Sequence, residues 1–166
     1  MYRLRELDEK DLPIINSWRN NKELIDCLGA PYRFINLVVD EAWFQNYLHH
    51  RDVTVRCSIV GNDDTILGLV SLTSLNMINQ TATLHIMIGE ANDYNKGIGT
   101  YAVKEMIQHA FNNLNLRRIE LEVLSENTRA RHVYEKVGFL HEGTKKKAVY
   151  KNGEFVDMEM YAIIKE

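Results

Sequence analysis

GEANDYNKGIGTY, residues 89–101, is the stretch that decides how this chain is organised. The run before it, residues 82–89, is mostly apolar and predicts a buried strand. After it, apolar residues at helical spacing predict a helix that begins within residues 97–100. The first amides of a helix have no partner inside it, and glycine lets a ligand approach the backbone closely. The stretch is therefore suited to bind a phosphate.

The stretch matches neither of two better-known phosphate-binding loops. A P-loop needs a Gly-Lys pair followed by Ser or Thr, a string that the chain lacks. A dinucleotide fingerprint needs a third glycine where Ala102 stands. The glycines could also do no more than make the turn between strand and helix.

Length and composition indicate one globular domain that spans residues 1–166. The hydrophobic fraction of 45% and the charged fraction of 26% are usual for globular proteins. The net charge of −3 argues against a nucleic-acid partner. Cys27 and Cys57 lie far apart and indicate neither a zinc knuckle nor a disulfide scaffold, so we expect no metal. Without an apolar leader or a run of membrane-spanning length, we expect a cytoplasmic protein with no membrane partner.

Periodicity and turn residues predict the order strand, helices, three strands, helix, strand, helix and two strands. The pattern dissolves over residues 20–36, a region that could cover a substrate, before Asp40 caps a second helix. The last two strands form a hairpin that turns at residues 151–154. The predicted strands are 2–7, 53–60, 66–72, 81–89, 119–124, 139–149 and 155–164, and the predicted helices follow Asp8, cover 41–50, begin within 97–100 and cover 127–137.

A second motif, SENTRARHVYEKVGF at residues 125–139, lies at a definite distance after the loop. Together the two motifs resemble those of the GNAT superfamily of acetyl-CoA-dependent N-acetyltransferases, and the match covers nearly the whole chain. W-R-N at residues 18–20 and VYKNGEFVDMEMYAII at residues 149–164 are similar to one branch of that superfamily. The branch contains ribosomal-protein N-terminal, polyamine and amino-sugar acetyltransferases.

The resemblance implies a fold and a donor substrate. The fold would be a single α/β (α+β) domain, with a central, mixed, mostly antiparallel twisted sheet flanked by helices on both faces. The donor would be acetyl-CoA, with its pyrophosphate on the loop. Tyr94 departs from the family pattern, which usually has Gln or Arg there, so binding would depend on backbone amides and on the charge of Lys96. The implied cofactor-binding residues are Met87, Ile88, Gly89, Asn95, Lys96, Gly97, Ile98, Gly99, Thr100 and Asn127.

The reaction needs a base for the amine and an acid for the leaving thiolate. By resemblance, Tyr134 is the acid and Glu122 the first candidate for the base, although Tyr134 could be a core tyrosine and Glu122 an exposed strand carboxylate. His85 is the second candidate, because its ordinary pKa suits a proton relay. A water relay without a single base is also open, and Thr83 stands where many relatives have a carboxylate. Asn127 would cap its helix and could also meet the pantetheine arm.

The acceptor is the least determined part of the prediction. We expect transfer to a primary amine of a small molecule, namely a polyamine, an amino sugar or an amino acid, or to a protein N-terminus. The alternative is a catalytically silent acyl-CoA-binding or sensor module, and a homodimer is left open. Six residues could line an acceptor pocket or equally belong to the core: Trp18, Arg19, Asn20, Tyr32, Trp43 and Tyr47.

Overall fold

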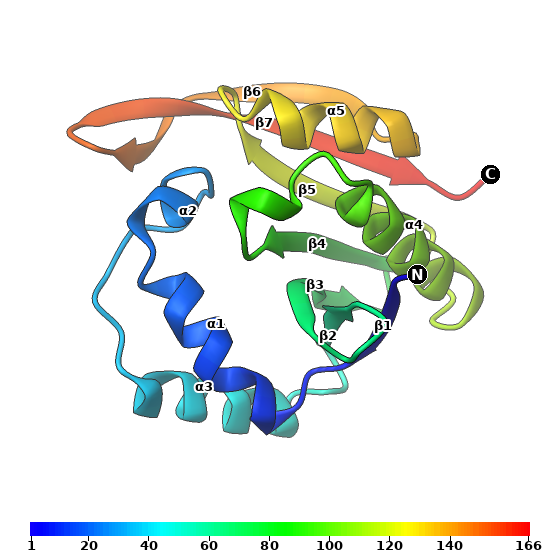
Figure 1. The fold of residues 1–166 in the computed structure, drawn as a ribbon. Coiled ribbons are helices and arrows are strands. Elements are labelled where there is room, and N and C mark those ends of the chain that lie inside the picture. Colours follow the sequence, from blue (N-terminus) through cyan, green and yellow to red (C-terminus); the bar gives the residue numbers. More distant parts are fainter.

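Seven strands form one mixed sheet in the order β1-β2-β3-β4-β5-β7-β6 (Figure 1). The structure is a computed structural model that describes residues 1–166. The strands are β1 (Arg3–Glu6), β2 (Val55–Val60), β3 (Ile66–Asn76), β4 (Thr81–Ile88), β5 (Arg118–Leu124), β6 (Leu140–Lys151) and β7 (Glu154–Ile164). The helices are α1 (Leu12–Arg19), α2 (Lys22–Asp26), α3 (Leu37–His49), α4 (Ile98–Asn112) and α5 (Thr128–Val137), with single turns of 3-10 helix at Glu9–Asp11 and Ala91–Asp93.

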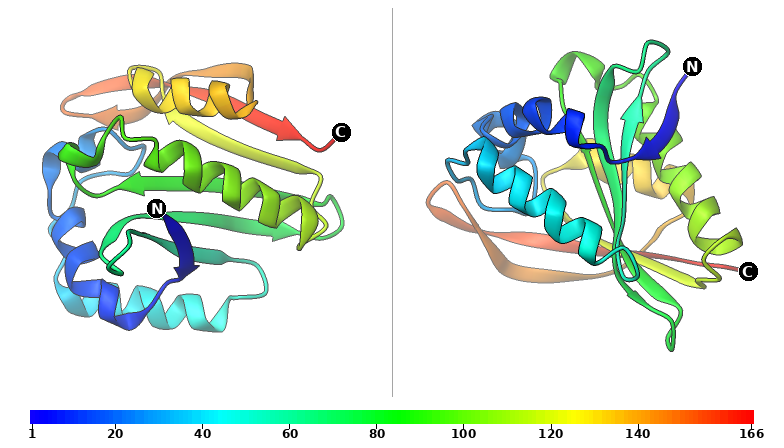
Figure 2. Two further views of the ribbon diagram at one scale, coloured as in Figure 1. Left: turned by 45° about the vertical axis from the view of Figure 1, so that its right-hand side comes forward. Right: turned by 90° about the horizontal axis from the view of Figure 1, so that it is seen from below.

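Helices cover both faces of the sheet, as the fold class predicted. Helices α1, α2 and α3 lie on one face, and α4 and α5 on the other (Figure 2). A large apolar core joins the sheet to α4 and α5 around Val103, Met106 and Ile119. A smaller one joins it to the N-terminal helices around Ile15 and Trp18. None of the helices combines the length and the apolar content of a membrane-spanning segment.

The two central strands are paired over only a short distance. β4 and β5 run parallel, and their register covers Thr81–Thr83 against residues 118–120. Beyond that point each strand stays paired with its outer neighbour, β4 with β3 as far as Ile88 and β5 with β7 as far as Leu124. The strands therefore diverge and open a gap in the middle of the sheet (Figure 1).

The N-terminal helices differ from the sequence prediction. A short helix, α2, lies within the stretch predicted to be irregular. Asp40 does not cap α3, because the helix begins at Leu37 and its N-cap is Asn36, whose side chain accepts from the Val39 amide. Asp40 is instead fully buried and forms an ion pair with Arg19. A capping residue and a buried partner for arginine can both be Asp, and spacing alone did not separate them.

Other boundaries follow from local chemistry that the sequence shows directly. Asp8 caps the first helical turn, and Asn127 caps α5 by accepting from the Ala130 amide, as predicted. The hairpin of β6 and β7 turns at residues 151–154, with Asn152 and Gly153 both at positive φ. β3 continues to Asn76, four residues beyond its predicted end, because it stays paired with β4.

Candidate active site

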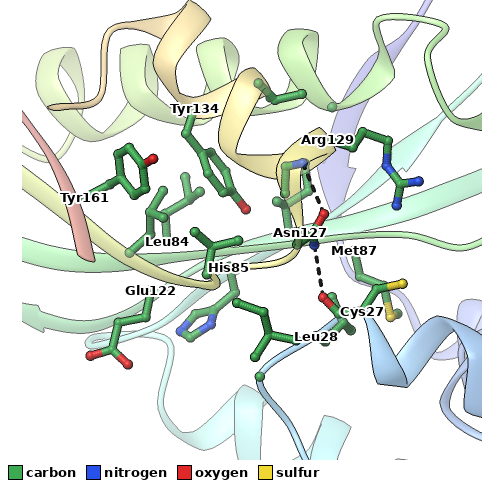
Figure 3. Close-up of a pocket in the computed structure, with 18 of the residues that line it drawn as sticks. Cys27, Leu28, Leu84, His85, Met87, Glu122, Asn127, Arg129, Tyr134 and Tyr161 are labelled. Atoms are coloured by element: carbon green, nitrogen blue, oxygen red, sulfur yellow. Dashed lines mark hydrogen bonds between the residues drawn. The ribbon is translucent and has the colours of Figure 1, made fainter. Parts of the chain in front are cut away.

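A cavity of about 1180 Å³ occupies the gap between β4 and β5 (Figure 3). It passes through the sheet, so residues from both faces line it. The start of α4 and the start of α5 border it on one face. The chain after α2 and side chains of β2, β3, β4 and β5 border it on the other. The cavity can therefore admit one molecule from each face.

The start of α4 leaves a row of free backbone donors beside this cavity. None of the N–H groups of residues 95–100 donates to a backbone acceptor, and no side chain caps the helix. Asn95 and Gly97 both have positive φ, 63° and 81°, which turns successive amides toward a common point. An ideal Cβ on Gly97 would meet no atom within 4 Å, so the space above the loop is open. The arrangement suits an anion such as a pyrophosphate.

The cavity gathers most of the predicted cofactor-binding residues. Met87, Ile88, Asn95, Gly97, Ile98, Gly99, Thr100 and Asn127 line it. Gly89 and Lys96 are not among the lining residues. Gly89 is buried where a Cβ would lie 1.9 Å from Cε2 of Trp18, so its role is to let the indole approach. Lys96 points its ammonium at Asp93, 3.2 Å away.

Arg129 supplies a positive charge that the sequence analysis missed. Its guanidinium lies 3.5 Å from the ring centre of Tyr94, and both side chains line the cavity beside the α4 loop. Arg129 forms no ion pair, so its charge is available to a ligand. The aromatic that departs from the family pattern thus holds an arginine from α5. The sequence shows Arg129 two residues after the capping Asn127, but it does not show that the side chain lies beside Tyr94. That contact exists only in the folded structure.

Tyr134 comes from α5 and directs its hydroxyl into the cavity (Figure 3). The side chain is buried, and the hydroxyl forms no hydrogen bond with the protein. The neighbouring Tyr161 differs, because its hydroxyl donates to Glu135 and accepts from Arg131. Burial raises the pKa of Tyr134 above its usual value, so the phenol is protonated at any physiological pH.

Glu122 and His85 approach the cavity from the opposite face (Figure 3). The β4–β5 register pairs Thr83 with Glu120, so His85 and Glu122 are the next facing positions across the gap. Glu122 forms an ion pair with Lys145. His85 Nε2 lies 3.0 Å from Thr73 Oγ1, which leaves Nδ1 without a protein partner. Burial first, and then the charge of Arg56, lower the pKa of His85 below its usual value, so the ring is neutral at pH 7.

One backbone donor also points into the gap. The Gly89 amide donates to the Leu67 carbonyl on β3, at 2.9 Å. Because amides alternate between the two edges of a strand, the Ile88 amide points to the β5 side, where β4 has no strand partner. A backbone donor at this place can stabilise the oxyanion that develops on a reacting carbonyl.

Residues 27–29 border the cavity and belong to the stretch 20–36 that the sequence suggested as a cover. Cys27, Leu28 and Gly29 line it, and the Asn127 side chain donates to the Cys27 carbonyl at 3.0 Å. The six residues considered for an acceptor pocket do not line it; they build the N-terminal framework instead. Trp18 and Tyr47 are buried, and Arg19 pairs with Asp40. The Asn20 side chain donates to the Ile35 carbonyl, and the Tyr32 hydroxyl donates to the Asn20 carbonyl. Trp43 packs against two guanidinium groups.

Arg56 on β2 is the second cavity residue that the sequence analysis missed. Its guanidinium lies over Trp43, with 4.9 Å between the carbon Cζ and the ring centre. Its only side-chain hydrogen bond is a long one, from Nη1 to Ser71 Oγ at 3.4 Å, and its Nε is buried without a partner. Burial lowers the pKa of Arg56, but a guanidinium stays charged at neutral pH. An isolated arginine in an alternating strand usually faces solvent, so nothing in the sequence pattern marks Arg56 as a cavity residue.

Comparisons with known proteins agree with this geometry. The model of the acetyltransferase (GNAT) domain matches residues 2–140. The spermidine N(1)-acetyltransferase of Vibrio cholerae is 28% identical over 162 residues, 97% of this chain and 91% of that protein. The Escherichia coli K12 protein of the same name is 30% identical over 155 residues, 92% of this chain and 80% of that protein. A crystal structure of the Vibrio cholerae enzyme with CoA and spermine superposes with a TM-score of 0.92 at 26% identity, covering 99% of this chain and 95% of that one.

Proposed function

This chain belongs to the GNAT family of acetyltransferases and uses acetyl-CoA as donor, and we propose that it acetylates a primary amine of a small molecule. The observation that carries this proposal is the cavity through the sheet, which has free backbone amides on one face and the side chains of His85 and Glu122 on the other. Two relatives are named for spermidine, so a polyamine is one of the candidate acceptors to be tested. The atoms balance simply: a bond forms between the amine nitrogen and the acetyl carbon, the carbon–sulfur bond breaks, and CoA leaves as a thiol.

On the donor face, the proposal assigns binding to the backbone and to Arg129. The amides of residues 95–100 would hold the pyrophosphate, together with the hydroxyl of Thr100. Gly99 keeps the backbone accessible, since no Cβ stands between the amides and the cavity. The Asn127 side chain accepts from the Ala130 amide and donates to the Cys27 carbonyl. These two bonds position α5 and the segment around Cys27 that borders the cavity.

At the reacting centre, Tyr134 would protonate the leaving thiolate. A free phenol is a weaker acid than a free thiol, and burial raises the pKa of Tyr134 further. Burial acts on a thiol in the same direction, as Cys57 shows with a pKa raised to about 11. A thiolate expelled into this enclosed gap is therefore a strong base, and an unpartnered phenol can donate to it.

Thiol release from acetyl-CoA tests the proposed function directly. The panel would contain spermidine, amino acids, amino sugars and a peptide with a free N-terminus. We expect release that depends on the amine, together with an acetylated product of matching mass. Tight binding of acetyl-CoA without turnover of any amine would instead support the silent acyl-CoA-binding module.

Arg129 provides a test of the donor face. We expect Arg129→Gln to raise KM for acetyl-CoA about 10-fold, the size of one lost charge-assisted hydrogen bond, with kcat little changed. Arg131→Gln is the matched control, because it removes a charge from the same helix. The Arg131 side chain donates to Ser125 and Tyr161 and is therefore not free to bind a ligand. An unchanged KM in Arg129→Gln, measured by initial rates, would remove Arg129 from the donor site.

The base is tested by comparing two carboxylates and one imidazole. We propose Glu122 as the base, and expect Glu122→Gln to lower kcat/KM about 100-fold, within the range of general base catalysis. Glu120→Gln, the next carboxylate on the same face, should change it little. If His85→Gln has the larger effect, His85 is the base. Activity should then fall only at a pH below the ordinary histidine value of about 6.5, because protonation removes the base and the pKa of His85 is lowered.

A further inference from the structure

Arg56 is a half-buried cation with a fully buried Nε, and the protein supplies no counter-ion for it. It forms no ion pair with any carboxylate of the chain, and its Nε has neither a partner nor contact with solvent. Burying an unpaired charge is costly, and a guanidinium cannot escape that cost by losing its proton. A charge kept in this state beside a cavity indicates that its partner arrives with the ligand.

Arg19 shows how the same fold treats a structural arginine. Its guanidinium also lies against Trp43, at 5.6 Å from the ring centre. Unlike Arg56, it has a buried carboxylate, Asp40, as its partner. Contact with the indole therefore does not replace a counter-ion in this region. The difference between the two arginines is that Arg56 lines the cavity and Arg19 does not.

Arg56 also belongs to a row of side chains that crosses the sheet. The strand register places Arg56 beside Ser71, and Ser71 beside His85. Across the gap the row continues to Glu122. One end of the row is therefore positive and the other end carries a carboxylate. A ligand with separated positive and negative groups matches this order of charges.

We propose that the acceptor of this enzyme carries, besides its amine, an anionic group that binds the guanidinium of Arg56 and the hydroxyl of Ser71. The anion is a carboxylate, as in an amino acid, or a phosphate, as in a phosphorylated amino sugar. The inference rests on the proposed function, because it assumes that an amine reacts in this cavity. It makes a purely cationic polyamine a poor acceptor, because the positive charge of Arg56 would repel it.

The spacing of the row limits where the anion lies relative to the amine. Neighbouring strands are about 4.8 Å apart. The Arg56 guanidinium extends from β2 to Ser71 on β3. The anion therefore lies about 5 Å or more from His85, which is one strand spacing. An amine that reacts at Glu122 lies farther along the same row, so the acceptor must span at least this distance between its anion and its amine.

Matched acceptors and two variants test the proposal. Each anionic acceptor is compared with the same amine without its anionic group. An amino acid is compared with its amide, and a phosphorylated amino sugar with the unphosphorylated amino sugar. Spermidine is the acceptor that carries only positive charges. We expect wild-type protein to prefer the anionic member of a pair, by about 10- to 100-fold in kcat/KM, as for a charge-assisted hydrogen bond. Arg56→Gln should abolish that preference, and Arg56→Lys should restore part of it. The pair that shows the preference tells carboxylate from phosphate.

Controls separate this inference from folding and from the proposed function. Arg33→Gln, an exposed arginine outside the cavity, should leave the preference intact, and KM for acetyl-CoA should stay unchanged in Arg56→Gln. Turnover of spermidine as good as that of every anionic acceptor, unaltered by Arg56→Gln, would overturn the inference and leave the proposed function standing.

If no amine is turned over, the proposed function fails and direct binding decides the inference. Trp43 lies against Arg56, so its fluorescence reports on ligands at that end of the cavity. Saturable quenching by the anionic compounds in wild type, lost in Arg56→Gln, would support the anion site. No saturation in wild type would refute it.

Discussion

Replacing Tyr134 with Phe should lower kcat about 10²- to 10⁴-fold, the contribution of a positioned general acid, without weakening the binding of acetyl-CoA. The hydroxyl has no partner in the protein, so its removal breaks no internal hydrogen bond. We therefore expect no loss of thermal stability. Initial rates, calorimetric titration with acetyl-CoA and a melting curve measure the three quantities on one preparation.

Tyr161→Phe is the matched control for Tyr134→Phe, because its hydroxyl has the opposite situation. It donates to Glu135 at 2.8 Å and accepts from Arg131 at 3.1 Å. Removing it should cost about 1 kcal/mol of unfolding free energy and leave kcat within a few-fold of wild type. If Tyr134→Phe keeps wild-type kcat, the acid is not Tyr134, and water would have to protonate the thiolate.

The substitution Gly89→Ala should destabilise the fold by about 3 kcal/mol, at the upper end of the usual cost of overpacking. A Cβ at this position would lie 1.9 Å, 2.2 Å and 2.5 Å from three ring atoms of Trp18. The indole cannot move aside easily, because it is 2% exposed and its Nε1 donates to Glu90 at 3.0 Å. Urea denaturation measures the change.

A double mutant and a second glycine sharpen this prediction. Trp18→Leu removes the ring, so Gly89→Ala should cost less in that background, with a coupling of about 1 to 3 kcal/mol. Gly99→Ala is the contrasting case, since its Cβ would meet Ile86 and Val133 at an ordinary 3.9 Å. It should raise stability by about 0.5 to 1 kcal/mol, yet raise KM for acetyl-CoA because the methyl group narrows access to the amides. Equal effects of the two substitutions on stability would refute the assignment of Gly89 to packing.

Local patterns predicted the elements around the donor site well. The α4 start, the Asn127 cap and the hairpin turn at residues 151–154 each depend on residues within a few positions of one another. Capping side chains and positive-φ glycines act over that distance, so the sequence shows them directly. The error at Asp40 has the same origin, because its true partner, Arg19, lies 21 positions away.

On the face of the sheet that carries His85 and Glu122, the sequence named these two side chains as base candidates, but it named neither Arg56 nor Ser71. These four side chains come from four strands, and each strand by itself shows only an alternating pattern. Arg56 is unremarkable on β2 until the register places it beside Ser71 and the cavity. The Arg129–Tyr94 contact likewise joins α5 to the α4 loop.

The sequence by itself determined the strand, loop and helix at residues 82–112, the place of Tyr134 within the second motif and the family to which the chain belongs. These follow from residue types at short, fixed spacing. Only the tertiary structure decided that β4 and β5 part after Thr83, that Gly89 serves Trp18, and that Arg56 is left without a counter-ion. The physical reason is that pairing, close packing and charge compensation depend on distances between segments far apart in the chain, and those distances exist only once the sheet has formed.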